Sequence, residues 1–166
     1  EKLREYLEEH FVVLKLDTSG IATAYIFRTR GLIYSNRGEW NEAIEPYQTA
    51  MEYAPTQSYI VVELANNYAV LDETDTAIQL LTDALERNPS DTAVLFKLAT
   101  TYQSNGNVER AYEYYSRCLD VDRNNMLCLS WLGGLQWQDG DFATAMVNLK
   151  RAVELGSKDP VDFWQL

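Results

Sequence analysis

Small residues recur in this sequence at a fixed spacing of 34, and this period constrains the fold more than any other feature. One set consists of Ala43, Ala77, Ala111 and Ala145. Two further sets keep the same phase: Ala50, Ala84, Cys118 and Ala152, and Gly31, Ala65, Ala99 and Gly133. A period of about 20–50 residues is typical of chains in which one supersecondary unit is repeated and stacked. The spacing therefore predicts a repeat protein.

Large residues follow the same period. They form two sets: Phe27, Val61, Leu95 and Leu129, and Tyr47, Leu81, Tyr115 and Leu149. Two helices approach closely only where one of them presents almost no side chain, because interiors are packed without voids. We therefore expect each small residue to receive a bulky side chain from the neighbouring helix.

A further set of residues predicts where helices end. Gly38, Asp72, Gly106 and Gly140 are also 34 apart, and glycine accepts the positive φ that commonly follows a helix. Pro55 and Pro89 lie where a second helix should stop, because proline cannot continue the hydrogen-bond ladder. Each repeat is therefore expected to be a helix, a tight turn and a second helix.

These residues resemble the tetratricopeptide repeat family, most clearly over the stretches GLIYSNRGEWNEAIEPYQTAMEYAP and LGGLQWQDGDFATAMVNLKRAVEL. The resemblance implies an all-α fold, a right-handed α-α superhelix of helix-turn-helix repeats. Four repeats are expected at residues 24–57, 58–91, 92–125 and 126–159. Residues 1–23 are expected to form a helical segment outside the pattern, and residues 160–166 to start a further or capping helix.

Composition narrows the functions that are open to this chain. A net charge of −11 repels phosphate and anionic lipid, so we expect no nucleic acid partner and no membrane surface. The acidic residues are interspersed, which indicates a solvated outer face or, alternatively, a basic partner. No apolar run approaches the ~18 residues that a membrane span needs, so no membrane insertion is expected. These features favour a cytoplasmic protein.

The cysteines and the single histidine offer little chemistry. Cys118 and Cys128 lie ten residues apart, and His10 is the only histidine. We expect neither a zinc cluster nor a disulfide framework, and interpret both cysteines as buried free thiols in a reducing compartment. Phosphate-binding loops, nucleophile elbows and metalloprotease motifs do not occur. The sequence therefore predicts a chain that is not an enzyme and holds no cofactor and no metal.

The family resemblance implies where a partner would bind, because the first helices of such repeats line a concave groove. Groove positions combine aromatic, amide and basic side chains that suit an extended peptide or a helix of apolar or basic character. The predicted binding residues are Tyr25, Arg28, Tyr59, Val62, Asn66, Phe96, Lys97, Thr100, Gln103, Trp131 and Trp137. The carboxylate clamp of some family members is not expected, since its places hold Arg28, Leu32, Glu63, Ala93 and Lys97 without an asparagine.

Two functions remain open at this point. The first is a scaffold or adaptor that binds a segment of another protein in the groove. The alternative is an assembly module that packs end to end with further repeats or with a second copy, through the apolar C-terminal segment PVDFWQL. Trp131 and Trp137 could be contact residues, or core residues packed against that segment.

Overall fold

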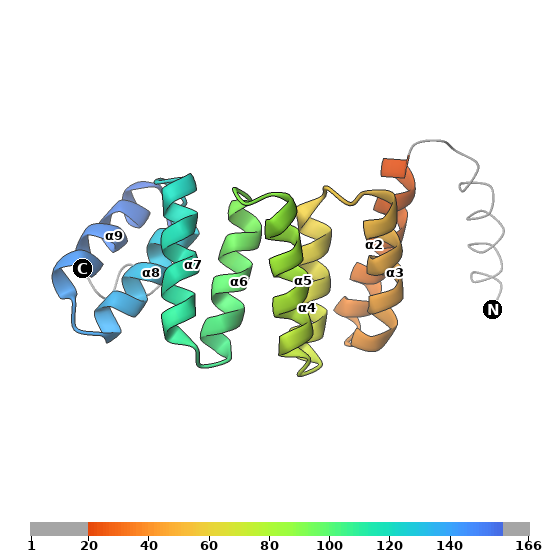
Figure 1. Cartoon of the computed structure of the whole chain (residues 1–166), viewed down its shortest axis with the longest axis horizontal. Coiled ribbons are helices and arrows are strands. Elements are labelled where there is room, and N and C mark those ends of the chain that lie inside the picture. Colours follow the sequence, from red (N-terminus) through yellow and green to blue (C-terminus); the bar gives the residue numbers. More distant parts are fainter. Residues whose placement is uncertain (1–19, 158–166) are drawn as a thin grey trace. The chain divides into compact units, whose positions relative to one another are not determined.

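A computed structural model of the chain describes residues 20–157. Within this range it contains eight α-helices, labelled α2 to α9, and no strand (Figure 1). The predicted all-α fold class is therefore confirmed. The helical segment predicted at residues 1–23 lies almost wholly outside the described residues, although α2 already begins at Gly20. The helix start predicted at residues 160–166 also lies outside them.

The chain divides into two compact units, with the boundary between Asp72 and Glu73. The described helices of the N-terminal unit are α2 (Gly20–Asn36), α3 (Trp40–Tyr53) and α4 (Ser58–Val70). Those of the C-terminal unit are α5 (Thr74–Arg87), α6 (Thr92–Ser104), α7 (Val108–Val121), α8 (Met126–Gln138) and α9 (Phe142–Glu154). Consecutive helices such as α2 and α3, or α6 and α7, lie side by side within their unit (Figure 1).

The helices end where the sequence predicts. Positive φ angles follow the first helix of each pair, at Gly38 (76°), Asp72 (64°), Gly106 (78°) and Gly140 (85°). Asp72 is the only non-glycine residue in the described chain with a positive φ, and aspartate tolerates this region better than bulkier residues do. Helices α3 and α5 end two residues before Pro55 and Pro89, respectively. The predicted helix ends are therefore confirmed.

Small residues meet large ones as predicted, and the two glycines show this most clearly. A Cβ atom placed on Gly31 would lie 2.9 Å from ring carbons of Tyr47, and one on Gly133 would lie 2.8 Å from Cγ of Leu149. Tyr47 and Leu149 are themselves buried, so neither has room to move away. The alanines of the first small set are also fully buried: Ala43, Ala77, Ala111 and Ala145.

The expectation for the cysteines was wrong, because Cys118 and Cys128 form a disulfide. Cys118 lies near the end of α7, and Cys128 lies in the first turn of α8. The short turn between these helices brings the two Cα atoms to 6.4 Å, a separation that a disulfide spans. Both residues are fully buried, as predicted, but among the described residues neither is a free thiol.

Candidate functional site

The predicted binding residues lie on the first helix of each pair, in two groups. We name the first group the α2–α4 face: Tyr25, Arg28, Tyr59, Val62 and Asn66. We name the second group the α6–α8 face: Phe96, Lys97, Thr100, Gln103, Trp131 and Trp137. The first belongs to the N-terminal unit and the second to the C-terminal unit. Each face is described within its own unit.

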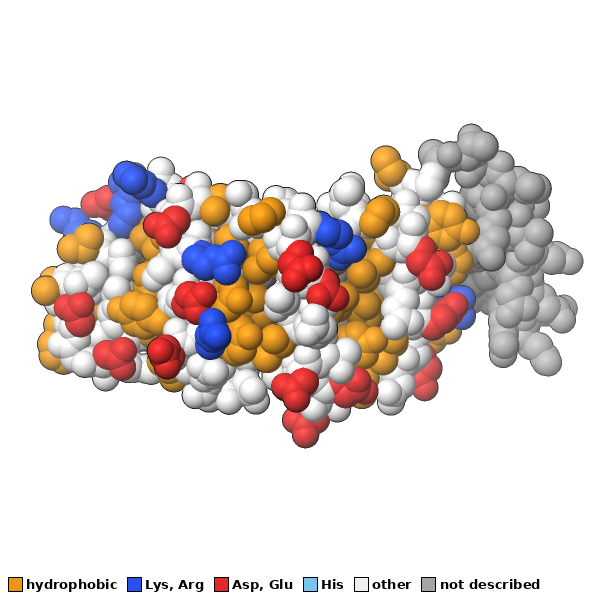
Figure 2. All heavy atoms as spheres, viewed as in Figure 1, with side chains coloured by type: hydrophobic (Ala, Val, Ile, Leu, Met, Phe, Trp, Pro, Cys, Tyr) orange, Lys and Arg blue, Asp and Glu red, His pale blue; other side chains and the backbone are white. Residues whose placement is uncertain are grey.

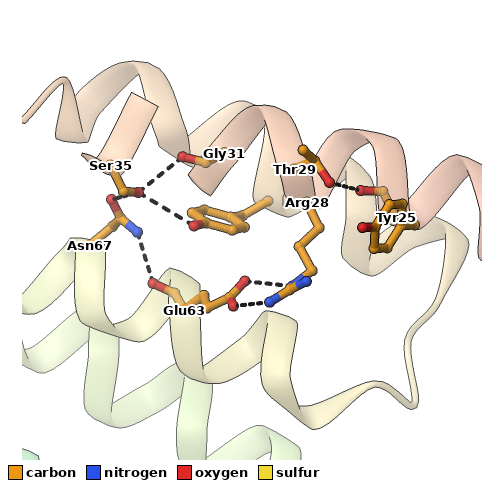
Figure 3. A network of polar contacts seen from close by, with 8 residues as sticks. Tyr25, Arg28, Thr29, Gly31, Ser35, Glu63 and Asn67 are labelled. Carbon is orange, nitrogen blue, oxygen red and sulfur yellow. Dashed lines mark hydrogen bonds and ion pairs between the residues drawn. The ribbon is translucent and has the colours of Figure 1, made fainter. Parts of the chain in front are cut away.

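Arg28 is the centre of the α2–α4 face. Its guanidinium binds the carboxylate of Glu63 through two nitrogens, with Nε donating to Oε2 at 2.9 Å (Figure 3). The guanidinium carbon also lies 4.7 Å from the centre of the Tyr59 ring, in a cation–π contact. The hydrogen bond to Glu63 raises the pKa of Arg28, so the side chain stays charged. Its charge is balanced within the unit, which leaves Arg28 poorly available to a ligand carboxylate.

Further hydrogen bonds join Ser35, Asn67 and the backbone of Glu63 next to this ion pair. Nδ2 of Asn67 donates to the backbone oxygen of Glu63 at 2.8 Å, and the Ser35 hydroxyl lies 2.9 Å from Oδ1 of Asn67 (Figure 3). Asn67 is only 2% exposed, whereas its neighbour Asn66 is exposed. Adjacent helical residues point in different directions, so one of these two amides joins α2 to α4 and the other meets solvent.

Of the other residues of the α2–α4 face, Tyr25, Tyr59 and Asn66 are exposed and Val62 is half-buried. Tyr59, Val62 and Asn66 follow one another at spacings of three and four along α4, which places them on one side of that helix. Tyr25 on α2 is 61% exposed, and Tyr59 is 41% exposed. An exposed carboxamide on the same side of α4 as an exposed tyrosine can hydrogen-bond to a peptide backbone while the ring supplies apolar contact.

Three aromatic rings from three helices meet at the α6–α8 face. The ring of Trp131 on α8 lies 6.3 Å from that of Phe96 on α6 and 6.5 Å from that of Tyr115 on α7, measured between centroids. Phe96 and Tyr115 are 5.9 Å apart. Tyr115 is fully buried, Phe96 is half-buried and Trp131 is 40% exposed. These three residues form a cluster with a buried base and an exposed indole, which we name the aromatic triad.

Tyr115 was not among the predicted binding residues, yet it contacts three of them: Phe96, Gln103 and Trp131. Its hydroxyl donates to Oε1 of Gln103 at 2.8 Å, so that oxygen of Gln103 is engaged within the unit. Burial raises the pKa of the Tyr115 hydroxyl, which keeps it protonated as a donor. The signal for this residue was present in the sequence, because Tyr115 belongs to the periodic set of large residues.

The remaining predicted residues of the α6–α8 face differ in what they can offer. Lys97 is half-buried without a salt bridge in the described part of the chain, and burial lowers the pKa of its ammonium group. Thr100 donates its hydroxyl to the backbone oxygen of Lys97 at 2.8 Å. Trp137 packs edge-on against Phe142 of α9, with ring centroids 4.8 Å apart. The predicted contact of the tryptophans with PVDFWQL lies outside the described residues.

The Arg28–Glu63 ion pair should contribute measurably to stability. We expect Glu63→Ala to lower the free energy of unfolding by about 1–3 kcal/mol, because it leaves a partly buried guanidinium without its carboxylate. Thermal and urea unfolding followed by circular dichroism would measure this loss. Glu113→Ala is the matched control, since its ion pair with Arg110 is solvent-exposed and its loss should leave the free energy of unfolding almost unchanged. Equal losses in the two variants would contradict the role given to Glu63.

The described residues offer neither a metal site nor a membrane-spanning helix. Between residues 20 and 157, no group of three or more His, Cys, Asp or Glu side chains is arranged to hold a metal ion. Over the same range, none of the helices has the length and apolarity to cross a membrane.

On the face shown in Figure 2, hydrophobic side chains gather over α6, beside acidic side chains on α5.

A family model and a curated relative that match this chain are both of the tetratricopeptide repeat type. Residues 71–129 match the tetratricopeptide repeat family. A mouse protein, tetratricopeptide repeat protein 21A, is 27% identical over 124 residues, which is 75% of this chain. The chain spans only 9% of the length of that relative. The match therefore concerns a repeat region and not the relative as a whole.

Solved structures share the fold at low sequence identity. A crystal structure of MamA aligns with a TM-score of 0.66 and 24% identity, covering 86% of this chain and 82% of MamA. A tetratricopeptide repeat protein from Parabacteroides merdae aligns with a TM-score of 0.71 and 18% identity, over 87% of this chain and 57% of its own. The first tetratricopeptide repeat domain of Spaghetti (RPAP3), solved bound to the HSP90 peptide SRMEEVD, aligns with a TM-score of 0.61 and 22% identity, over 72% and 95%.

Proposed function

We propose that this chain, which carries tetratricopeptide repeats, is a non-catalytic scaffold or adaptor that binds a segment of another protein. Proteins of this fold serve in general as platforms for protein–protein interaction. The observation that carries the proposal is the aromatic triad, in which Trp131 is 40% exposed although it rests on the buried ring of Tyr115. A rigid and partly exposed indole is the type of side chain on which binding energy concentrates.

The α6–α8 face favours an apolar segment. Phe96 and Trp131 present ring edges and faces whose burial by a partner would remove apolar surface from water. The net charge of −11 would attract a segment with flanking basic residues and would raise its association rate at low salt. On the α2–α4 face, taken by itself, the exposed Asn66 could bind a peptide backbone without reading its side chains.

A ligand like the HSP90 peptide bound to Spaghetti fits this chain poorly. That peptide ends in acidic residues and a carboxylate, which require unpaired cations in the binding groove. Of the two predicted cations, Arg28 is already bound to Glu63 and covered in part by Tyr59. The half-buried Lys97 is the other, and burial disfavours its charged form. We therefore infer a partner whose recognition depends on apolar and backbone contacts.

The alternative function, end-to-end packing with further repeats or with a second copy, is favoured by one observation. Helix α9 exposes Phe142, Met146 and Val147, with 52%, 47% and 68% of their surfaces accessible. Contiguous apolar surface of this kind on a repeat protein can be covered by a further repeat or by a second copy. Particle mass measured over a range of concentrations would favour this alternative if it rose with concentration.

The disulfide bears on the compartment in which this chain functions. Disulfides persist mainly in oxidising compartments and are rare where thiol reductants are kept reduced. The bond between Cys118 and Cys128 therefore weighs against the predicted reducing, cytoplasmic location. We infer that the chain functions where this disulfide can form and persist.

Binding would be tested with a peptide selected from a random 12-residue display library on the wild-type protein. We expect Trp131→Ala to weaken the selected peptide about 30-fold, which corresponds to ~2 kcal/mol, because it removes the exposed wall of the triad. A selected peptide that binds the α2–α4 face instead should be weakened by Asn66→Ala, about 3–10-fold, through the loss of hydrogen bonds. Isothermal titration calorimetry would give both dissociation constants.

The matched control is Val147→Ala, which removes an exposed apolar side chain outside both faces. It should change the dissociation constant by less than about twofold. Circular dichroism must show the same helical content in every variant. If Trp131→Ala and Asn66→Ala both bound the peptide as well as the wild type, neither face would be the binding site. A loss on Val147→Ala instead would place the interaction on α9.

A further inference from the structure

The disulfide lies directly next to the aromatic triad in the packing of α7 against α8. Cys118 follows Tyr115 by three residues on α7, and Cys128 precedes Trp131 by three residues on α8. Residues three apart lie on the same side of a helix, so each cysteine shares a helix side with one ring of the stacked Tyr115–Trp131 pair. The covalent bond and the ring pair are therefore successive layers of one interface.

The disulfide fixes the distance between α7 and α8 where this interface begins. It holds the Cα atoms of Cys118 and Cys128 at 6.4 Å, one helical turn from the rings. The orientation of Trp131 depends on this distance, because its indole is tilted by only 24° from the Tyr115 ring and also meets the ring of Phe96, which itself contacts Tyr115. A shift of α8 away from α7 would separate the stacked rings and expose Tyr115.

We propose that the redox state of Cys118 and Cys128 regulates binding at the α6–α8 face, with the oxidised form assembling the aromatic triad. This inference rests on the proposed function of that face. Cys118 and Cys128 act as positioning residues, since they reach a bound segment only through Tyr115 and Trp131. In the dithiol form, α8 is joined to α7 by the turn and by side-chain packing alone, and Trp131 gains freedom to leave Tyr115.

Reduction of the disulfide between Cys118 and Cys128 requires a thiol or a phosphine. A thiol reduces it in two steps. A reductant thiolate attacks one sulfur, which forms a mixed disulfide and releases the other cysteine as a thiolate that takes up a proton. A second reductant thiolate attacks the reductant sulfur of that mixed disulfide, releasing the remaining cysteine, which is protonated, and the oxidised reductant. Both cysteines are fully buried, so the attack requires local opening of the turn between α7 and α8. The oxidised form should therefore outlast brief exposure to reductant.

Trp131 can report this change without any partner. The chain has four tryptophans, and replacing Trp40, Trp137 and Trp164 with phenylalanine leaves Trp131 as the single fluorophore. We expect acrylamide to quench its fluorescence about twice as strongly after reduction with a phosphine, because the ring is 40% exposed while the triad is assembled. A thiol titration on the same sample must show that both cysteines are reduced.

Two control variants separate positioning from a general loss of stability. In the single-tryptophan protein, Cys118→Ala with Cys128→Ala should give the high quenching at once and should not respond to phosphine. Leu64→Ala removes a buried side chain in the N-terminal unit, so it should lower stability without changing the quenching of Trp131. Unchanged quenching in a fully reduced sample would overturn the inference, as would an equal rise in Leu64→Ala.

The peptide selected on the oxidised wild-type protein gives the second readout. We expect its affinity to fall about tenfold on reduction and to be restored when a small disulfide oxidant accepts the two electrons, is itself reduced to two thiols and the bond between Cys118 and Cys128 forms again. Equal affinity in the two redox states would overturn the regulatory role even if Trp131 moved. If the oxidised protein bound no library peptide at all, the proposed function would fail at this face. The quenching measurement would still decide whether the disulfide positions the triad.

Discussion

Gly31→Leu is expected to lower the free energy of unfolding of the N-terminal unit by about 3 kcal/mol. Even a single Cβ atom at this position would lie 2.9 Å from Cδ1, Cε1 and Cζ of Tyr47, and leucine adds three more carbons. The tyrosine ring is 1% exposed and cannot turn aside without displacing its neighbours. Leucine has a better helix propensity than glycine by up to about 1 kcal/mol, which offsets only part of this loss.

The control for this substitution is Ala22→Leu, which introduces the same side chain at an exposed position of α2. It should leave the unfolding midpoint within the range of an ordinary surface change, about 0.5 kcal/mol. Urea unfolding followed by circular dichroism measures both variants. If Gly31→Leu were as stable as the wild type, α2 and α3 would not approach each other as closely as the structure shows.

Tyr115→Ala is expected to have the largest effect in the C-terminal unit, a loss of about 3–5 kcal/mol in the free energy of unfolding. It removes a fully buried ring that contacts both Phe96 and Trp131, and it leaves Gln103 without its hydroxyl donor. Peptide binding should also be lost, because Trp131 would no longer have the ring of Tyr115 to stack on. Differential scanning calorimetry would measure the stability, and calorimetric titration the binding.

Tyr115→Phe divides this effect into its two parts. The ring remains, so only the hydrogen bond to Gln103 is removed, and the expected loss is about 1 kcal/mol. Affinity for the selected peptide should then stay close to that of the wild type. A large loss of affinity in Tyr115→Phe would mean that Gln103, freed from Tyr115, changes the face more than the ring does. That result would contradict the role given to the triad.

The fold could be predicted from the sequence because its repeat signals are local. Helix ends depend on a single residue's backbone preference, which is why Gly38 and Asp72 could be placed from spacing alone. The contact of Gly31 with Tyr47 also follows from the pattern, since the two residues lie on consecutive helices joined by a tight turn. Such contacts repeat with the period, so each occurrence supports the interpretation of the others.

The candidate site could be predicted only in part, because its contacts differ from one repeat to the next. The binding face of each helix follows from helical spacing, but the partners of Arg28 do not: Glu63 lies 35 residues away, and its bond depends on the exact register of α2 against α4. The same holds for Cys118 and Cys128. Their ten-residue separation indicates nothing until the turn between α7 and α8 sets their distance.

The disulfide also changes how this chain would respond to mechanical force. Stacked repeats pulled from their two ends unravel in steps, since each repeat contacts only its neighbours. The bond between Cys118 and Cys128 excludes the nine residues between them from that extension, which shortens the fully extended chain by about 30 Å. Tension would therefore pass from α7 to α8 through a covalent bond, and the junction between these two helices would stay joined after the packing around it had been pulled apart.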